Sequence, residues 1–358
     1  MHMADALLSP AVGGAMWAAS AAAIAYATHR LRRDGGDDRI VPLMGVLGAF
    51  LFAAQMITFT IPATGSSGHL GGGLLLAILL GPFAAVLTIA SVLVVQALFF
   101  ADGGILALGC NIFNMGVIPA FIVYPLVYRK IAGTSPGQRR RTVAILVSAL
   151  VGLQLGPLCV VLETWLSGIA ALPFTTFLLF MQPIHLAIGV VEGGVTAAVV
   201  SFLLKARPDI VLGATEAVPS DRHPLRGVLA TFMAIALVTG GVVSWEASRN
   251  PDGLEWAIAR ATATGGQEAP PRGWQGIVAR LQQKIAVLPD YSFKRPDGAG
   301  PAAGQSTESR TGMPEKAAGG LQSVADARVG TSVAGVVGTI MVLAIVWVGG
   351  RILAGRRP

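Results

Sequence analysis

Charged residues are scarce in this sequence, and cysteines are almost absent. Only 13% of the 358 residues are Asp, Glu, Lys or Arg, whereas 53% are hydrophobic. A soluble globular domain carries about 25% charged residues, and a disordered chain would need low hydrophobicity. Two cysteines are too few for a disulfide framework. These shortages exclude an ordinary soluble domain, a disordered chain and a disulfide-stabilised scaffold.

Motifs of nucleotide binding and hydrolysis are also missing. The sequence has no G-x-x-x-x-G-K-[ST] loop, no H-E-x-x-H and no G-x-S-x-G. An enzyme is therefore not predicted, and any ATP hydrolysis would need a separate subunit. The sequence also lacks the internal repeat that is typical of inverted-repeat secondary transporters.

Long apolar runs are the main feature that is present. A helix needs about 20 apolar residues to cross a bilayer, so these runs predict an all-α polytopic membrane protein. A shorter run at 70–81 is counted as a short span or half-span, which brings the total to nine. The full candidates lie near residues 11–29, 41–61, 83–100, 105–128, 142–162, 183–204, 227–245 and 333–353.

Basic residues lie mainly in the loops between these runs. Loops 28–40, 129–141 and 205–226 hold four, five and four of the 26 Lys and Arg. Because short basic loops stay in the cytoplasm, we expect these loops and the C-terminus inside a plasma (inner) membrane. The N-terminus, loop 61–70 and segment 247–332 are then outside. Basic residues placed in this way indicate contact with membrane lipid and not with nucleic acid.

The spacing of the runs predicts two modules. Residues 1–204 form a compact bundle with short loops, and residues 205–226 form a polar cytoplasmic linker. Residues 227–358 form a helical hairpin that encloses the external segment 247–332. Within that segment, 261–330 is rich in Gly, Ala, Pro and Gln and is expected to be poorly ordered.

The first two residues predict a metal site. The first basic side chain is Arg30, so the start lacks the basic region of a secretory signal. His2 is too large for the usual removal of Met1, and we expect a free amine followed directly by His2. That amine, the deprotonated amide nitrogen of His2 and His2 Nδ1 can chelate one metal in a plane, and square-planar nitrogen sites suit Cu(II) or Ni(II). His69, in the external loop GSSGHLGGG, is the expected fourth donor. The alternative is that His2 is incidental.

Polar residues inside the apolar runs have two interpretations. His185 and Glu192 lie seven residues apart and therefore on one helix face. They either line or steady the metal site, or they hold two helices together. Asn111 and Asn114 are either supporting partners that orient the histidines or polar contacts between helices.

Four acidic residues outside the spans are interpreted as structural. Asp102, in the segment FFADGGIL, is expected to be a turn or cap residue. Asp252 and Glu255, like Asp290, are expected to be turn and helix-cap residues; the alternative is that they bind metal weakly.

The first span carries alanine at every fourth position. Small residues at this spacing permit close helix contact in lipid, which favours either docking to a separate membrane subunit or packing within this bundle. The stripe consists of Ala11, Ala15, Ala19, Ala23 and Ala27.

Five segments together resemble a known transporter family. They are GSSGHLGGGLLLAILLGP (65–82), FADGGILALGCNIFNMG (100–116), QPIHLAIGVVEGG (182–194), PDGLEWA (251–257) and LPDYSF (288–293). Up to residue 204 the sequence resembles the substrate-binding membrane component of a cobalt/nickel energy-coupling factor (ECF) transporter. The remainder resembles the small PDGLE-type accessory subunit of such systems, fused to the first part.

This resemblance implies a fold, a function and partners. The fold is a bundle of about seven helices of the ECF substrate-binding type plus a two-helix accessory hairpin. The chain captures Ni(II) or Co(II) outside as transported substrate, holds it with Met1, His2 and His69, and has no tightly bound cofactor. A transmembrane coupling subunit and ABC-type ATPases are the expected partners. In place of the family's usual Gly-containing opening the chain has Met3-Ala4-Asp5-Ala6, which puts in doubt how this segment folds back.

Two alternatives come from other classes. A stand-alone secondary carrier or channel would transport metal without an ATPase. A membrane metallohydrolase would need His69, His185 and Glu192 to converge around an open metal position.

Overall fold

The computed structural model describes residues 2–33, 39–134, 136–206, 225–263, 273–293 and 320–354. Within them the protein is almost entirely helical. The long helices are α1 (Pro10–Arg33), α2 (Ile40–Gln55), α4 (Pro82–Phe99), α7 (Gln138–Ser167), α8 (Phe174–Ala206), α9 (Leu225–Gly241) and α12 (Gly320–Ala354). The shorter ones are η1 (Asp5–Leu7), α3 (Gly73–Leu80), α5 (Leu108–Ile112), α6 (Arg129–Ala132), η4 (Val243–Glu246), α10 (Gly253–Ala263), α11 (Trp274–Ile285) and η5 (Pro289–Tyr291). A π-helix, η2 (Phe113–Tyr128), links α5 to α6, and β1 (Phe59–Ile61) pairs antiparallel with β2 (Ser66–Gly68).

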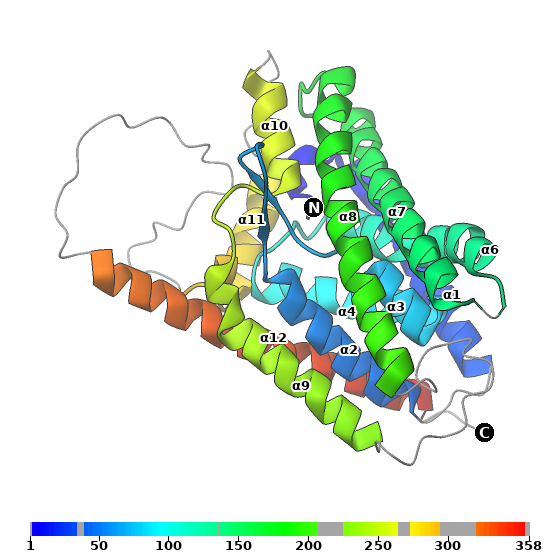
Figure 1. Cartoon of the computed structure of the whole chain (residues 1–358). Helices are drawn as coiled ribbons and strands as arrows, with labels where there is room; N and C mark the ends of the chain where they lie inside the picture. Colours follow the sequence, from blue (N-terminus) through cyan, green and yellow to red (C-terminus); the bar gives the residue numbers. More distant parts are fainter. Residues whose placement is uncertain are drawn as a thin grey trace.

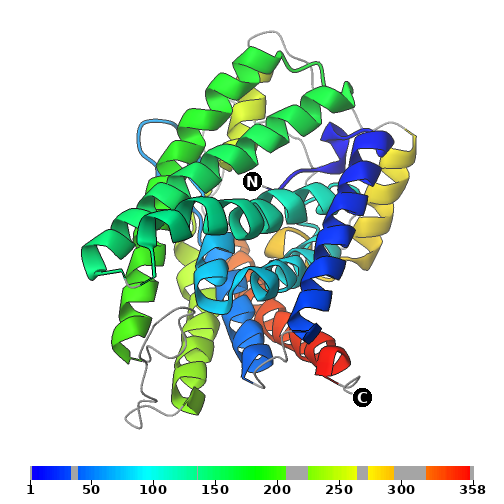
Figure 2. The same cartoon turned by 90° about the vertical axis from the view of Figure 1, so that its right-hand side faces the viewer.

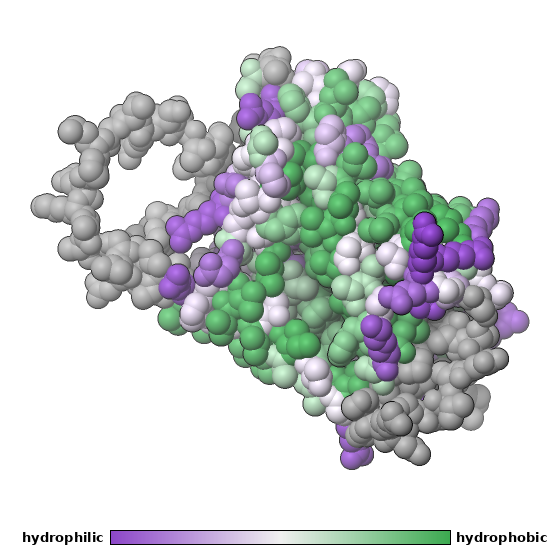
Figure 3. All heavy atoms as spheres, viewed as in Figure 1, coloured by the Kyte–Doolittle hydropathy of each residue, from purple (hydrophilic) through white to green (hydrophobic). Residues whose placement is uncertain are grey.

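The apolar helices confirm the prediction of an all-α membrane protein. Six of the described helical stretches are long and apolar enough to cross a bilayer, and α2 and α9 are apolar but shorter. Large apolar side chains such as Leu179, Phe202 and Trp347 are exposed, as expected where helices face lipid. Figure 3 shows apolar residues over the helical face and strongly hydrophilic ones towards the ends of the molecule.

Two predicted spans differ from the structure. The run 41–61 is helical only to Gln55, because Phe59–Ile61 pairs as a strand with Ser66–Gly68. The run 70–81 contains α3, whose eight residues are all buried. At about 1.5 Å per residue this helix is too short to cross a bilayer, so α3 is a half-span inside the bundle.

The accessory hairpin packs directly on the first module. Helices α9 and α12 contact each other and both contact α2 (Figure 1). They approach closely because Gly240 faces Gly335, where an added Cβ on Gly335 would lie 2.1 Å from the Gly240 carbonyl oxygen. Small residues permit such helix crossings in lipid. Helices α7 and α8 form a second antiparallel pair on the other side of α3 and η2 (Figure 2).

The external segment is more ordered than the composition predicted. Residues 253–263 and 274–285 form α10 and α11, and the short η5 follows after residues 286–288. The prediction of a poorly ordered 261–330 is therefore wrong for α11, whose buried Gln275 and Gln282 bond to backbone carbonyls of the first module. Most of the remaining stretch, and most of the linker 205–226, lies outside the described residues.

The alanine stripe does not stay on one side of α1. Ala11, Ala15 and Ala19 are exposed, Ala23 is half-buried and Ala27 is fully buried in the core. Each step of four residues turns about 40° beyond a full turn in a helix of 3.6 residues per turn. The stripe therefore winds from the outside of the bundle, where Figure 2 shows α1, into its interior.

Candidate metal centre

The N-terminal segment is fixed inside the bundle by α5. The Met3 N–H donates to Asn111 Oδ1 (2.8 Å), and the Met3 carbonyl accepts from Asn111 Nδ2 (3.3 Å) and from the Gly104 N–H (2.9 Å). Asp5 Oδ1 accepts from the Ala107 N–H (2.9 Å). The sequence Met3-Ala4-Asp5-Ala6 thus folds back without the family's glycine, and Asn111 holds the segment that carries His2.

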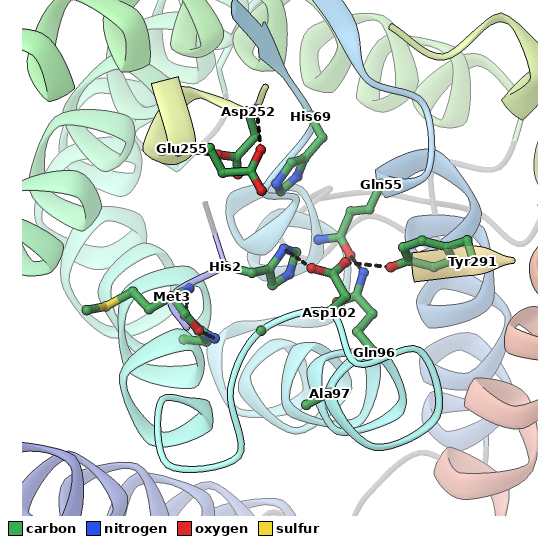
Figure 4. A network of polar contacts seen from close by, with 12 residues as sticks. His2, Met3, Gln55, His69, Gln96, Ala97, Asp102, Asp252, Glu255 and Tyr291 are labelled. Carbon is green, nitrogen blue, oxygen red and sulfur yellow. Dashed lines mark hydrogen bonds and ion pairs between the residues drawn. The ribbon is translucent and has the colours of Figure 1, made fainter. Parts of the chain in front are cut away.

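His2 and His69 lie face to face, although 66 positions separate them in the sequence. Their rings are stacked, with centroids 5.1 Å apart and planes 13° apart (Figure 4). The His2 side chain is only 8% exposed and His69 is buried. Met1 lies outside the described residues, but its bonds to His2 keep the amine within about 5 Å of the His2 Cα. The structure therefore brings together the side chains that the sequence selected as metal ligands.

Burial disfavours the charged form of both imidazoles, and the neutral form is the one that binds metals. Burial lowers the pKa of His69 to about 3. Burial also lowers the pKa of His2, although the Asp102 carboxylate acts in the opposite direction. His2 Nδ1 lies 3.2 Å from Asp102 Oδ1, and His2 Nε2 is buried without a hydrogen-bond partner among the described residues. Nδ1 of His2 thus has a carboxylate partner among the described residues.

The loop that carries His69 is held by two side chains from different helices. Glu192, on α8, accepts the Gly71 N–H (2.7 Å) and the Gly72 N–H (3.1 Å). Gln55, at the end of α2, donates to the Gly71 carbonyl (3.0 Å). Of the two interpretations of Glu192, the contacts agree with the steadying role.

We expect Glu192→Ala to weaken metal binding about 10- to 100-fold, the usual effect of losing an outer partner of a metal ligand. Two buried N–H groups would lose their acceptor, at about 1–3 kcal/mol each. Glu192→Gln keeps one acceptor oxygen and should lie between the two. The measurements are Ni(II) affinity and thermal unfolding in detergent. The exposed Glu246 provides the control, and an effect of Glu246→Ala as large as that of Glu192→Ala would contradict this role.

His185 and Asn114 lie in different surroundings. His185 Nδ1 donates to the Met181 carbonyl (2.8 Å), and its buried Nε2 has no partner among the described residues. His185 and His69 line the same cavity of about 10 Å³, which is room for about one water molecule. Asn114 instead donates to the buried Glu163 on α7 (2.8 Å) and joins two helices. The interhelical interpretation therefore describes Asn114.

Sequence reasoning missed the role of Asp102. Its N–H donates to the Gln96 carbonyl (3.0 Å), as expected of a turn residue. Its carboxylate, however, faces His2 with Oδ1 and accepts the Tyr291 hydroxyl with Oδ2 (2.6 Å). No local sequence pattern around Asp102 predicts its contacts with His2 and Tyr291. The only signal in this segment was its resemblance to the transporter family.

The PDGLE segment closes the site from the accessory half. Asp252 Oδ1 accepts the Glu255 N–H (2.8 Å), and Glu255 Oε2 accepts the Asp252 N–H (3.2 Å). This capping box confirms the prediction of cap residues. The Ser67 N–H donates to the Pro251 carbonyl (2.8 Å), so the cap lies beside the His69 loop, as Figure 4 shows.

Side chains alone do not complete a metal site here. Within the described part of the chain, no three His, Cys, Asp or Glu side chains are grouped to hold a metal ion. A four-nitrogen site around His2 and His69 therefore needs the backbone nitrogens of residues 1 and 2. Chelation through His2 Nδ1 also needs the ring to turn about its Cβ–Cγ bond. A half-turn exchanges Nδ1 with Cδ2 and Nε2 with Cε1, which brings Nε2 to the ring edge that faces Asp102.

Comparisons with known proteins agree with both halves of the chain. Residues 2–210 match the family described as the cobalt uptake substrate-specific transmembrane region, and residues 226–355 match the PDGLE domain. A fused NikMN protein of Archaeoglobus fulgidus is 32% identical over 96% of both chains. The fused nickel transport protein NikMN of Rhodobacter capsulatus is 30% identical over 82% of this chain and 88% of its own length.

A solved structure has a similar fold over part of the chain. The crystal structure of a truncated transition metal transporter superposes with a TM-score of 0.51 and 31% identity, covering 57% of this chain and 99% of that one. These relatives are named as transport proteins, and nickel and cobalt are the metals in their names. The chain therefore belongs to the cobalt uptake substrate-specific transmembrane family, as a member with a fused PDGLE accessory domain.

Proposed function

We propose that this chain is the substrate-binding component of an ATP-driven ECF-type importer for Ni(II) or Co(II). The observation that carries the proposal is the stacked pair of buried imidazoles of His2 and His69 next to the chain's first residue. The names of the relatives support nickel or cobalt as the transported substrate.

Four nitrogens hold the metal in this proposal. The Met1 amine, the deprotonated His2 amide nitrogen and His2 Nδ1 chelate it, and His69 supplies the fourth donor. Four nitrogens in a plane suit Ni(II), and the same donors accept Co(II). Because Cu(II) would bind such a set more tightly still, selectivity depends on metal availability and on the closely packed surroundings of the site.

The metal enters from the outer side of a plasma membrane. The N-terminal segment, the His69 loop and the described part of 248–293 lie together at one end of the bundle. These are the segments that the charge pattern places outside. The basic loop 129–141 and the C-terminus then face the cytoplasm.

The partners supply the energy. Because the sequence has no phosphate-binding loop, a pair of ABC-type ATPases and a transmembrane coupling subunit complete the transporter. The exposed residues Ala11, Ala15 and Ala19 on α1 form a surface on which a partner helix can pack closely in lipid. Ala23 and Ala27 contribute to packing within the bundle.

Metal uptake by cells tests the dependence on ATP. Cells without other nickel uptake would express this chain together with a coupling subunit and its ATPase pair. We expect Ni(II) accumulation that is lost when the phosphate-binding lysine of the ATPases is changed to Ala. Equal accumulation by this chain alone would contradict the proposal and favour a stand-alone carrier or channel.

The metallohydrolase alternative would use the carboxylate of Glu192 to activate water. Both oxygens of Glu192 accept backbone N–H groups of the His69 loop. The side chain that would activate water is therefore already used in holding the loop.

A further inference from the structure

A line of polar contacts runs from the accessory half of the chain to His2. The Tyr291 hydroxyl donates to Asp102 Oδ2 (2.6 Å), and Asp102 Oδ1 lies 3.2 Å from His2 Nδ1 (Figure 4). Tyr291 and Asp102 are 189 positions apart in the sequence. Each carboxylate oxygen of Asp102 therefore has one partner, one in each module.

Tyr291 is held firmly in the position that makes this contact. Its ring stacks on Phe100, with centroids 5.0 Å apart and planes 14° apart. The N–H groups of Val287 and Leu288 donate to the Phe99 carbonyl (2.9 and 3.1 Å), and the Asp290 N–H donates to the Phe100 carbonyl (2.9 Å). Segment 287–291 is thus bonded along the residues that directly precede the Asp102 turn.

The backbone at this point is strained. Asp290 and Tyr291 both have positive φ, 51° and 57°, a conformation that residues other than glycine adopt at a cost. Such strain persists only where surrounding contacts impose it, and it concentrates at functional sites. Ring stacking on Phe100 alone would not require the hydroxyl to end on a carboxylate.

A carboxylate behind a metal-binding histidine has a known physical effect. It accepts the N–H of the ring nitrogen that is not bound to the metal, which fixes the tautomer and the ring orientation. In the structure the nitrogen that faces Asp102 is Nδ1. When the ring turns so that Nδ1 chelates the metal, Nε2 comes to the edge that faces Asp102, and the carboxylate can then hold the ring in this orientation. The hydroxyl of Tyr291 in turn restrains the orientation of the Asp102 carboxylate.

We propose that Tyr291 is a positioning residue for metal binding, which acts through Asp102 on the ring of His2. This inference rests on the proposed function, because it assumes that His2 is a metal ligand. In this proposal the Tyr291 hydroxyl of the fused PDGLE domain helps to orient a metal-binding residue of the first module.

The test is a double-mutant cycle on the full-length chain in detergent, with Ni(II) alone as the probe. Tyr291→Phe keeps the ring on Phe100 and removes only the hydroxyl, and Asp102→Asn keeps the shape and removes the charge. We expect Asp102→Asn to weaken Ni(II) binding about 10- to 100-fold and Tyr291→Phe about threefold to tenfold. The double variant should bind like Asp102→Asn alone, because the hydroxyl acts through that carboxylate.

A spectroscopic measurement separates positioning from simple packing. In both single variants the ligand-field absorption of bound Ni(II) should shift or broaden, since the orientation of His2 is less defined. The matched control is Tyr124→Phe, which removes a hydroxyl from a buried tyrosine on η2. Unchanged affinity and spectrum in Tyr291→Phe, fully additive effects, or an equal effect of Tyr124→Phe would overturn the proposal.

One further variant distinguishes failure of the Tyr291 proposal from failure of the proposed function. A chain with Gly-Ser placed before Met1 has every side chain but no free amine at the chelating position. If it loses Ni(II) while Tyr291→Phe binds normally, only the positioning role is wrong. If it binds Ni(II) as the native chain does, the N-terminal site itself is wrong.

Discussion

Placing Gly-Ser before Met1 is expected to abolish metal binding by this protein. The extension converts the amine into a peptide nitrogen, which removes one of the four proposed donors. It also adds two residues next to a closely packed region. The packing around His2 is tight, since a Cβ added to Gly103 would lie only 3.3 Å from the His2 Cβ. We expect Ni(II) or Co(II) affinity to fall by at least about 100-fold, or about 2.8 kcal/mol.

Metal content after purification in detergent and titration calorimetry measure this effect. The native chain should retain about one Ni(II) or Co(II), and the extended chain almost none. The same dipeptide added after Pro358 is the matched control. Cleavage by a protease that leaves Met1 as the first residue should restore binding. Equal binding by native and extended chains would exclude the amine as a ligand and direct attention to the cavity shared by His69 and His185.

His69→Ala is the second substitution with a large expected effect. It removes the proposed fourth donor, an imidazole that burial keeps neutral by lowering its pKa to about 3. The loop should keep its shape, because Glu192 and Gln55 bond to the backbone of Gly71 and Gly72 and not to the histidine. We therefore expect a loss of affinity above the 10- to 100-fold that is typical of outer partners, with little change in thermal unfolding of the metal-free protein.

His29→Ala is the matched control for this substitution. His29 is exposed near the end of α1, on the side that the charge pattern assigns to the cytoplasm. Its removal should leave Ni(II) affinity unchanged. If His69→Ala binds Ni(II) as well as His29→Ala does, His69 is not a ligand.

The helices were largely predictable because hydrophobic length is a local property. Any run of about 20 apolar residues avoids exposing backbone polar groups to lipid only by forming a helix. The end of α2 was not predictable in this way. Residues 56–61 are apolar enough to continue the helix, but β1 pairs with β2, and the Thr58 carbonyl accepts the Ser248 N–H from the accessory half.

The same distinction applies to the supporting residues. Asn111 and Asn114 are similar in sequence, three positions apart, and both were open to two interpretations. The structure bonds Asn111 to Met3 beside the candidate site and Asn114 to Glu163 between helices. The neighbour that each helix face contacts depends on the packing of the whole bundle. A local sequence pattern does not predict these contacts.

The sequence by itself determined the all-α membrane class, the two modules and the choice of His2 and His69, because chain length across lipid and chelation by adjacent nitrogens are local chemistry. Only the tertiary structure decided that the two rings stack, that α3 is a buried half-span and that the alanine stripe winds inward. Only the tertiary structure places Tyr291 of the accessory half against Asp102, which in turn contacts His2. Contacts between residues nearly 200 positions apart arise from packing, and they leave no periodic or compositional mark in the chain.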